Sequence, residues 1–462
     1  MLTAEENDLL CRVEHGAPMG GLMRCHWIPV CLSEEVAEPD GAPVKARILG
    51  EDLVVFRDTQ GRVGVMDEYC PHRRVSLVLG RNEECGLRCL YHGWKMDVEG
   101  NVVEMASEPG ASALKEKVKH RAYPVQEWGG WVWSYLGAAL GSQAAAQTHA
   151  AGPLPASAAP RAGPAVLEAP LFEPPPYAPT ANTTVSIAKV IIPCNWAQIL
   201  EGAIDSAHSS SLHSSDFVPA RVAAAEANAK QWLRPSTDKS PRLQVQHTSY
   251  GFRYAALRRP IASATVNATT HEYVRTTIFV APFAVLIPPN NLYNVANINV
   301  PVDDTHTAFY FIAWGDAANT PATEEWRKFL GQQVGIDLND RYEPLRNIGN
   351  QFWQDRQAMQ AGNYTGIKGF PNQDIAMWLT MGAGPIADRS VERLGASDQA
   401  VVEFRKQMVA AARAFADGAP AIGTGEARIA QGVCSFQAVM PKSSDWRKIE
   451  FAKDIASAVK AA

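Results

Sequence analysis

Cys70-Pro-His72 is followed, nineteen residues after its cysteine, by Cys89-Leu-Tyr-His92. Each motif offers one thiolate and one imidazole to a metal. Two thiolates on one iron and two imidazoles on the other suit an asymmetric 2Fe–2S cluster, whose reduction potential lies above that of an all-thiolate cluster. A structural zinc site is the alternative, but zinc motifs usually place both cysteines in one half and both histidines in the other. We therefore predict that all four residues bind an iron–sulfur cluster.

A cluster with two thiolates on one iron and two imidazoles on the other is a Rieske cluster. The residues around its ligands indicate which kind of Rieske protein this is. Respiratory Rieske proteins carry an additional cysteine in each ligand loop, and these two cysteines form a disulfide. Here Arg73 and Arg74 follow the first histidine, and Cys85 is a single extra thiol that we interpret as a small hydrophobic residue. The loops resemble those of aromatic-ring oxygenases instead.

The composition is typical of a globular bacterial enzyme. The chain has 462 residues, enough for two or three domains, and a net charge of −5 that gives no sign of binding to nucleic acid or an anionic membrane. No stretch approaches the apolar run of roughly 18 residues expected of a membrane-spanning helix. The acidic segment Met1–Asp8 does not resemble a signal peptide. Six further cysteines are scattered, as in a reducing compartment, so we expect a cytoplasmic protein.

The first 137 residues are predicted to form a helical segment (1–24) and an all-β domain (25–137). Thr3 can cap a helix that continues to about Arg12. Short apolar runs broken by turn residues then predict strands, and the runs are Leu53–Phe56, Val63–Met66 and a closing strand over Trp128–Tyr135. This pattern places the two ligand loops at hairpin tips, close to the surface.

The remaining chain is predicted to be an Ala/Pro-rich linker or inserted loop (138–178) and an α+β domain (179–462). The linker has few apolar residues, and we expect part of it to be mobile. Beyond it, strand patterns alternate with helical ones, and the clearest strands are Val185–Ile192, Val274–Val280 and Phe309–Ile312.

A second group of metal-binding residue types lies between Asn195 and His213. Apolar residues recur every three or four positions after Asn195, which predicts a helix, while Glu201, Asp205 and His208 form a polar stripe. His213 lies five residues beyond His208, so the helix must loosen or bend if both imidazoles bind one metal. Alone, the pair could also be solvated side chains at a helix end. Beside a Rieske cluster, it indicates the two histidines of a non-haem Fe(II) site.

Together the two groups resemble the Rieske non-haem iron ring-hydroxylating oxygenases, and most closely the phthalate dioxygenase group. The resemblance covers nearly the whole chain, including Asp67–Arg74, Arg81–Glu84, Cys194–His208 and Gly369–Asp374. It implies an all-β Rieske domain followed by an α+β catalytic domain with an antiparallel sheet, of the helix-grip or START-like type. The segment after residue 138 is an insertion relative to that group, and residues 378–380 lack a glutamate that the group usually carries.

The resemblance also implies a third iron ligand, Asp374. This residue follows Asn372 and Gln373 near the start of a helical pattern, so it could instead be a helix-capping aspartate. Asp355 and Asp388 are the alternative carboxylate ligands.

In the family, electrons cross from the cluster of one subunit to the iron of its neighbour. Asp205 matches the carboxylate that bridges a cluster histidine of one chain and an iron-bound histidine of the next. Such a carboxylate fixes both imidazole tautomers. A solvent-facing helix aspartate is the alternative. The bridging role requires a ring of subunits, either a homotrimer or a hexamer built as a dimer of trimers.

Arginines are the candidates for binding the substrate. Arginine suits a carboxylate because its planar fork makes two parallel hydrogen bonds. We expect Arg234 and Arg275 to bind an acidic substrate, and Ser206 to add a hydrogen bond; surface ion pairs are the alternative role for the arginines. Other candidate arginines are Arg242, Arg253, Arg258 and Arg259. The remaining histidines show no ligand spacing, and we interpret them as structural.

The resulting hypothesis is the oxygenase component of a multicomponent dioxygenase, with one 2Fe–2S cluster and one mononuclear Fe(II) per chain. It cis-dihydroxylates an aromatic carboxylate such as phthalate, using O2 and electrons from a separate NAD(P)H-dependent flavin and iron–sulfur reductase. The chain shows no convincing dinucleotide-binding loop, so a partner must oxidise the nicotinamide. The alternatives are an isophthalate or terephthalate dioxygenase, a Rieske monooxygenase or O-demethylase on another aromatic acid, and a Rieske electron carrier.

Overall fold

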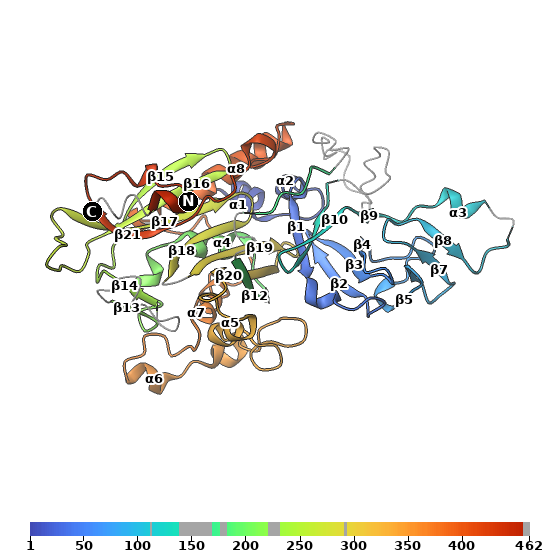
Figure 1. Cartoon of the computed structure of the whole chain (residues 1–462), viewed down its shortest axis with the longest axis horizontal. Coiled ribbons are helices and arrows are strands. Elements are labelled where there is room, and N and C mark those ends of the chain that lie inside the picture. Colours follow the sequence, from blue (N-terminus) through green and yellow to red (C-terminus); the bar gives the residue numbers. More distant parts are fainter. Residues whose placement is uncertain (111–112, 138–168, 176–182, 220–231, 291–292, 456–462) are drawn as a thin grey trace.

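The structure is a computed structural model that describes residues 1–110, 113–137, 169–175, 183–219, 232–290 and 293–455 (Figure 1). Most of the Ala/Pro-rich segment 138–178 therefore lies outside the described residues. An all-β region and a larger α+β region lie side by side along the long axis of the molecule. No helix in the described part is long and apolar enough to cross a membrane.

The chain begins with two short helices that pack against the C-terminal part of the molecule. Thr3 caps α1 (Ala4–Cys11) in a capping box with Glu6, which confirms the helix predicted to end near Arg12. After it comes α2 (Pro18–Arg24), and both helices contact α8 (Gln399–Ala416). The helical segment is therefore an extension of the catalytic domain's packing, although it precedes the β domain in sequence.

In its described residues, the β domain contains three small antiparallel sheets. They contain β1 (Trp27–Leu32), β11 (Trp131–Tyr135) and β10 (Val125–Trp128); β2 (Val44–Ile48), β3 (Glu51–Arg57), β4 (Val63–Asp67) and β9 (Ala122–Tyr123); and β5 (Arg81–Glu83), β6 (Gly86–Arg88), β7 (Trp94–Met96) and β8 (Val102–Met105). The strands predicted around residues 53 and 63 are present as β3 and β4, which are paired neighbours. The short helix α3 (Leu114–Lys117) follows β8.

The predicted single closing strand at 128–135 is wrong in one respect. The chain reverses at Gly129 and Gly130, whose φ angles of 67° and 91° lie in the left-handed region that glycine adopts without strain. The result is a hairpin in which β10 pairs with β11 and Trp128 lies opposite Trp131. All of β11 is buried, because β1 and β10 flank it and the larger domain packs against it.

The larger domain is built on an antiparallel sheet that, within the described residues, has eight strands. Its order is β12 (Thr183–Ile192), β20 (Thr307–Asp316), β19 (Tyr293–Pro301), β18 (Ala284–Asn290), β17 (His271–Val280), β16 (Gly251–Arg258) and β15 (Arg242–Thr248), with β21 (Gln437–Pro441) also paired to β17. The helix α4 (Trp196–Ile204) packs on β17, β18 and β19, and α8 packs on β15. The expected α+β class with an antiparallel sheet is confirmed.

Further elements surround this sheet. They are α5 (Thr323–Leu330), α6 (Arg356–Gln360), α7 (Phe370–Trp378) and a short parallel pair formed by β13 (Phe217–Pro219) and β14 (Trp232–Arg234). The sheet and the β domain share one hydrophobic core. In this core the ring of Trp131 lies edge-on to Tyr310, with 6.3 Å between the ring centroids. This shared core joins the β domain to the larger domain.

Helix α4 is anchored from both ends by buried polar groups. Asn195 caps its first turn and also donates to the carbonyl oxygens of Cys11 and Asp304. Near its other end, the Glu201 carboxylate accepts from Arg389 and Arg405, with N–O distances of 2.8–3.0 Å. Burial opposes charge on Glu201, but the two guanidinium groups hold the pKa of its carboxyl below the ordinary value. Glu201 therefore fixes the helix and is not part of the polar stripe that the sequence predicted.

Candidate metal centres

The two cysteine–histidine loops have the same backbone closure. The amide of Arg74 donates to the carbonyl of Cys70 (2.9 Å), and the amide of Gly93 donates to the carbonyl of Cys89 (3.0 Å). Arg74 and Gly93 both have left-handed backbone angles, with φ of 58° and 74°. The second loop joins the paired strands β6 and β7, and an isolated bridge between Tyr69 and Ser76 closes the first. Both loops are therefore hairpin tips, as predicted.

Their side chains converge in a way that fits a metal cluster. The rings of His72 and His92 have centroids 4.5 Å apart, and the Nδ1 atoms of both are buried with no hydrogen-bond partner among the described residues. Burial raises the pKa of the Cys70 thiol to about 11, and the adjacent Cys89 adds to this effect. A bound metal cluster would supply a partner for each unpaired buried nitrogen and the positive charge that the Cys70 thiol needs to ionise. The indole of Trp94 stacks on His72, with 4.6 Å between centroids and an interplanar angle of 7°.

The helix predicted after Asn195 ends earlier than the apolar pattern suggested. α4 stops at Ile204, and Asp205 has extended backbone angles. The chain then turns into a short 3-10 helix, His208–Ser210, before it reaches His213. The bend that five-residue spacing required is thus a complete break of the helix. It brings the two imidazole rings to a centroid separation of 5.1 Å.

Asp374, on α7, completes a three-ligand group with these histidines. Its Oδ1 atom lies 3.5 Å from Nε2 of His208 and 3.1 Å from Nε2 of His213. One donor atom from each of the three residues lies within 4.8 Å of the others. Two imidazoles and one carboxylate on one face, with the remaining positions open, are typical of a non-haem Fe(II) site. The donor set therefore fits a mononuclear iron.

The other carboxylates considered as third ligand lie elsewhere. Asp355 caps α6 by accepting from the amides of Gln357 and Ala358. Asp388 accepts from the amide and hydroxyl of Ser390. Neither is in the group of metal-binding side chains around His208 in the described part of the chain.

Close packing of α4 and α7 allows Asp374 to approach His208 and His213. A Cβ atom added to Gly202 would lie 2.2 Å from Nε1 of Trp378, so only glycine allows the two helices to approach this closely. Trp378 itself is buried and stands in the segment where the phthalate dioxygenase group usually has a glutamate. Here this segment supports the site by packing.

Gln373 orients His213 and was not predicted. Its Oε1 lies 2.8 Å from Nδ1 of His213, while its Nε2 donates to Asp216 (2.9 Å) and to the carbonyl of Ile367 (3.0 Å). Because the amide nitrogen is fully engaged as a donor, the oxygen must accept from Nδ1–H, which leaves Nε2 free for a metal. The position of Gln373 immediately before Asp374 was the signal available in the sequence.

Asp205 lies beside the other histidine. Its Oδ2 is 3.5 Å from Nδ1 of His208, and its Oδ1 accepts from the amide of Ala207 at 2.7 Å. Burial disfavours the charged carboxylate, but the hydrogen bond to His208 holds the pKa of Asp205 below its ordinary value. The sequence-predicted pair Asp205 and His208 is thus in place within one chain.

Three buried arginines lie near these ligands: Arg234 on β14, Arg258 on β16 and Arg275 on β17. Arg234 donates to the hydroxyls of Ser209 and Ser210 (2.9 Å each), and Arg258 donates to the carbonyl of Ser206 (2.6 Å). Burial lowers the pKa of Arg234 to about 9 and that of Arg258 to about 10, and the Arg275 charge adds to both shifts. In the described residues none of the three forms an ion pair with a carboxylate. Arg275 and Arg234 were predicted here, and Arg258 was one of the alternatives.

The other predicted binding residues have different neighbours. The hydroxyl of Ser206 lies 3.1 Å from that of Tyr254, and its carbonyl is the acceptor for Arg258. Arg242 pairs with Glu272, and Arg259 pairs with Asp238. Arg253 donates to backbone carbonyls near residue 449. These three arginines are therefore engaged away from the arginine cluster.

We predict that Gln373→Leu weakens iron binding at the mononuclear site by about 10- to 100-fold, because the imidazole of His213 loses the acceptor that fixes its tautomer. Gln354→Leu, which removes a different side-chain amide that donates to the carbonyl of Thr365, is the matched control and should bind iron as the parent does. The measurement is an anaerobic Fe(II) titration of the apoprotein, with the Rieske absorption spectrum as an internal control. Equal iron affinity in the leucine variant and the parent would show that Gln373 does not hold the ring.

Comparison with known proteins agrees with this geometry. Residues 26–129 match the Rieske [2Fe-2S] domain, and residues 163–462 match the LigXa C-terminal domain-like family. The chain is 69% identical to the phthalate 4,5-dioxygenase oxygenase subunit of Pseudomonas putida, over 97% of this chain and 94% of that one. It is 35% identical to the 3-chlorobenzoate-3,4-dioxygenase oxygenase subunit of Comamonas testosteroni, over 96% and 97%.

The fold is shared with solved oxygenase structures. A caffeine-bound variant of NdmA from Pseudomonas putida CBB5 superposes with a TM-score of 0.54 at 16% identity, covering 92% of this chain and 99% of that one. The 2Fe–2S cluster and the mononuclear iron expected from the sequence are therefore the cofactors of this chain. The alternative of a structural zinc ion at the two cysteine–histidine loops does not hold. The chain belongs to the Rieske non-haem iron oxygenases, as an oxygenase component with a LigXa-like C-terminal domain.

Proposed function

We propose that this protein adds both atoms of O2 to phthalate, an aromatic dicarboxylate, as the oxygenase component of a multicomponent dioxygenase. The observation that carries this proposal is the group of three buried arginines beside the two histidines and Asp374. The name of the relative that is 69% identical, phthalate 4,5-dioxygenase oxygenase subunit, supports it independently.

The arginine cluster has the charge that a dianion requires. Three buried guanidinium groups repel one another, and the depressed pKa values of Arg234 and Arg258 reflect the cost of burying them without a carboxylate partner. Several of their nitrogens, including Nε of both residues, are buried without a partner in the described structure. Two adjacent carboxylates on one ring would supply the missing negative charge and the acceptors for bidentate hydrogen bonds.

The chain's own residues position the substrate and exclude water. When bound by His208, His213 and Asp374, Fe(II) supplies the capacity to bind and activate O2. The arginines orient the acid so that the ring edge faces the open side of this group, and Ser209 and Ser210 hold Arg234 in place. Phe217 contacts both His213, at a ring-centroid distance of 5.3 Å, and Arg234, and so helps to keep the site dry.

We also propose that electrons reach the iron from a neighbouring subunit in a homotrimer or a dimer of trimers. Strands β5 to β8, which carry the second cluster loop, lie at the end of the molecule remote from α4 and α7 (Figure 1). Leu79, Leu90 and Tyr91 are more than half exposed around the cluster loops, as expected of a surface that docks another protein. Asp205, already beside His208, is the residue that would accept from a cluster histidine of that neighbour.

Electron supply requires a separate reductase that oxidises NAD(P)H through a flavin and its own iron–sulfur centre.

None of the eight cysteines, all of which are described, forms a disulfide, which suits a protein of the reducing cytoplasm.

Turnover of phthalate under 18O2 with a generic reductase tests the reaction. We expect a cis-dihydrodiol dicarboxylate in which both new oxygens are labelled. A single labelled atom would contradict the proposal and support a monooxygenase or O-demethylase. Isophthalate, terephthalate and benzoate serve as comparison substrates, and faster turnover of any of them would reassign the substrate.

Arg258→Met should raise KM for phthalate by about 10- to 150-fold, because a charge-assisted hydrogen bond of about 1.5–3 kcal/mol is lost. Arg259→Met is the matched control: this neighbour has a side chain that is 81% exposed and already pairs with Asp238, so KM should not change. Steady-state kinetics measure both. An unchanged KM in Arg258→Met would exclude this residue from the substrate pocket.

Asp205→Asn should keep the Rieske absorption spectrum and lose coupled turnover by about 10- to 100-fold or more, because the hydrogen-bonded link between the two metal centres is weakened. The iron content must be measured in parallel, so that loss of iron is distinguished from loss of electron transfer. Stopped-flow oxidation of the reduced cluster is the direct measurement. Normal oxidation rates in the variant would rule out the bridging role.

A further inference from the structure

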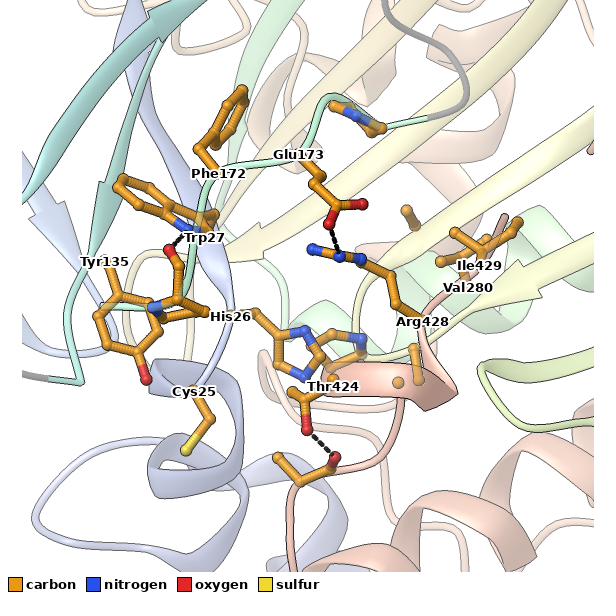
Figure 2. A pocket seen from close by; sticks show the side chains of 18 of the residues that line it. Cys25, His26, Trp27, Tyr135, Phe172, Glu173, Val280, Thr424, Arg428 and Ile429 are labelled. Carbon is orange, nitrogen blue, oxygen red and sulfur yellow. Dashed lines mark hydrogen bonds and ion pairs between the residues drawn. The ribbon is translucent and has the colours of Figure 1, made fainter. Parts of the chain in front are cut away.

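A separate cavity of about 720 Å³ lies where the β domain meets the catalytic domain (Figure 2). Its wall is formed by residues near 25–27 and 133–135, by the described segment 170–175, and by parts of 280–284 and 415–431. None of the metal-binding side chains or the three buried arginines lines it. This volume is typical of a small-molecule pocket.

Several aromatic rings line the cavity. The ring of Phe172 lies edge-on to Trp27, with centroids 5.3 Å apart, and is tilted against Trp133 at 5.7 Å. The segment that carries Phe172 is held in place because Nε1 of Trp27 donates to the carbonyl of Pro170 (3.0 Å). Phe283 and Phe415 also line the cavity. Flat apolar walls of this kind favour an aromatic ring.

His26 provides one polar contact point in this cavity. Its Nε2 atom is buried and has no hydrogen-bond partner in the described structure. Burial lowers the pKa of His26 to about 4, although a hydrogen bond to the backbone of Ile422 partly opposes this shift, so the imidazole is neutral at pH 7. Since the ring donates to the Ile422 carbonyl, Nε2 is left as an acceptor. A ligand hydroxyl could donate to it.

The cavity carries no uncompensated charge. Its charged lining residues are Glu173 and Arg428, and these form an ion pair with each other (Figure 2). Cys25 and Tyr135 stay neutral, because burial raises the pKa of both groups. A carboxylate would lose its hydration here without gaining a free cation, in contrast to the arginine cluster near the metal ligands.

We propose that this cavity is a second binding site, which takes an uncharged aromatic molecule with one hydroxyl group, of the phenol class. The ring packs against the surface formed by Trp27, Trp133 and Phe172, and the hydroxyl donates to Nε2 of His26. The site is distinct from the proposed substrate pocket in both position and charge preference, and it joins the two domains. Its ligand therefore binds together with phthalate and does not compete with it.

The test uses the full-length, iron-loaded protein and calorimetric titration with 2-naphthol, in the presence and absence of saturating phthalate. The expected result is one site per chain, with the same affinity in both conditions. Naphthalene, which lacks the hydroxyl, and 2-naphthoate, which is anionic, should each bind about tenfold more weakly or worse. Displacement of 2-naphthol by phthalate, equal binding of 2-naphthoate, or no binding of 2-naphthol would overturn the proposal.

Three variants locate the site. His26→Phe should reduce the affinity for 2-naphthol to that of naphthalene, whereas Ala421→Trp should fill the cavity and abolish binding of both. Ala414→Trp, an exposed position on α8 outside the cavity, is the matched control and should bind as the parent does. Phthalate turnover should persist in all three, which confirms correct folding. Unaltered 2-naphthol affinity in His26→Phe would overturn the assigned contact, even if Ala421→Trp failed to fold.

Discussion

The mononuclear iron site depends on the close approach of two imidazoles and one carboxylate oxygen that come from distant parts of the sequence. Nε2 atoms of His208 and His213 both point at Oδ1 of Asp374, at 3.5 and 3.1 Å. Three such acceptor-type atoms gathered in a partly buried space are stabilised by a shared cation. The break after α4, the close contact at Gly202 and the hydrogen bond from His213 to Gln373 all serve to create this geometry.

Buried charged side chains have two contrasting kinds of surroundings in this protein. Glu201 is matched by Arg389 and Arg405, and this compensated cluster fixes α4 in the core. The arginines near the metal ligands have no acidic partner in the described residues, and their pKa values are depressed accordingly. Compensated charge therefore belongs to the scaffold, whereas uncompensated charge indicates where a ligand of opposite sign binds.

Local motifs allowed the sequence to predict much of this arrangement, and long-range packing explains what it missed. The cluster ligands and the histidine pair are short-range patterns, and the strand periodicity predicted β3, β4 and β12 correctly. By contrast, the role of Glu201 depends on arginines almost two hundred residues away, and periodicity alone could not show that α4 ends at Ile204. The choice of Arg258 among several arginines required the strand pairing of β16 and β17, which places it near Arg275. The hairpin at Gly129 and Gly130 was readable in principle, but the alternating aromatic residues obscured it.

The most direct test is the iron content of protein reconstituted anaerobically, combined with electron paramagnetic resonance of its reduced cluster. The account predicts three irons per chain, two of them in a Rieske-type signal, and two irons with an unchanged signal in Asp374→Ala. Three irons retained in Asp374→Ala, or only two in the parent, would contradict the cooperation of two iron centres on which the proposed reaction rests.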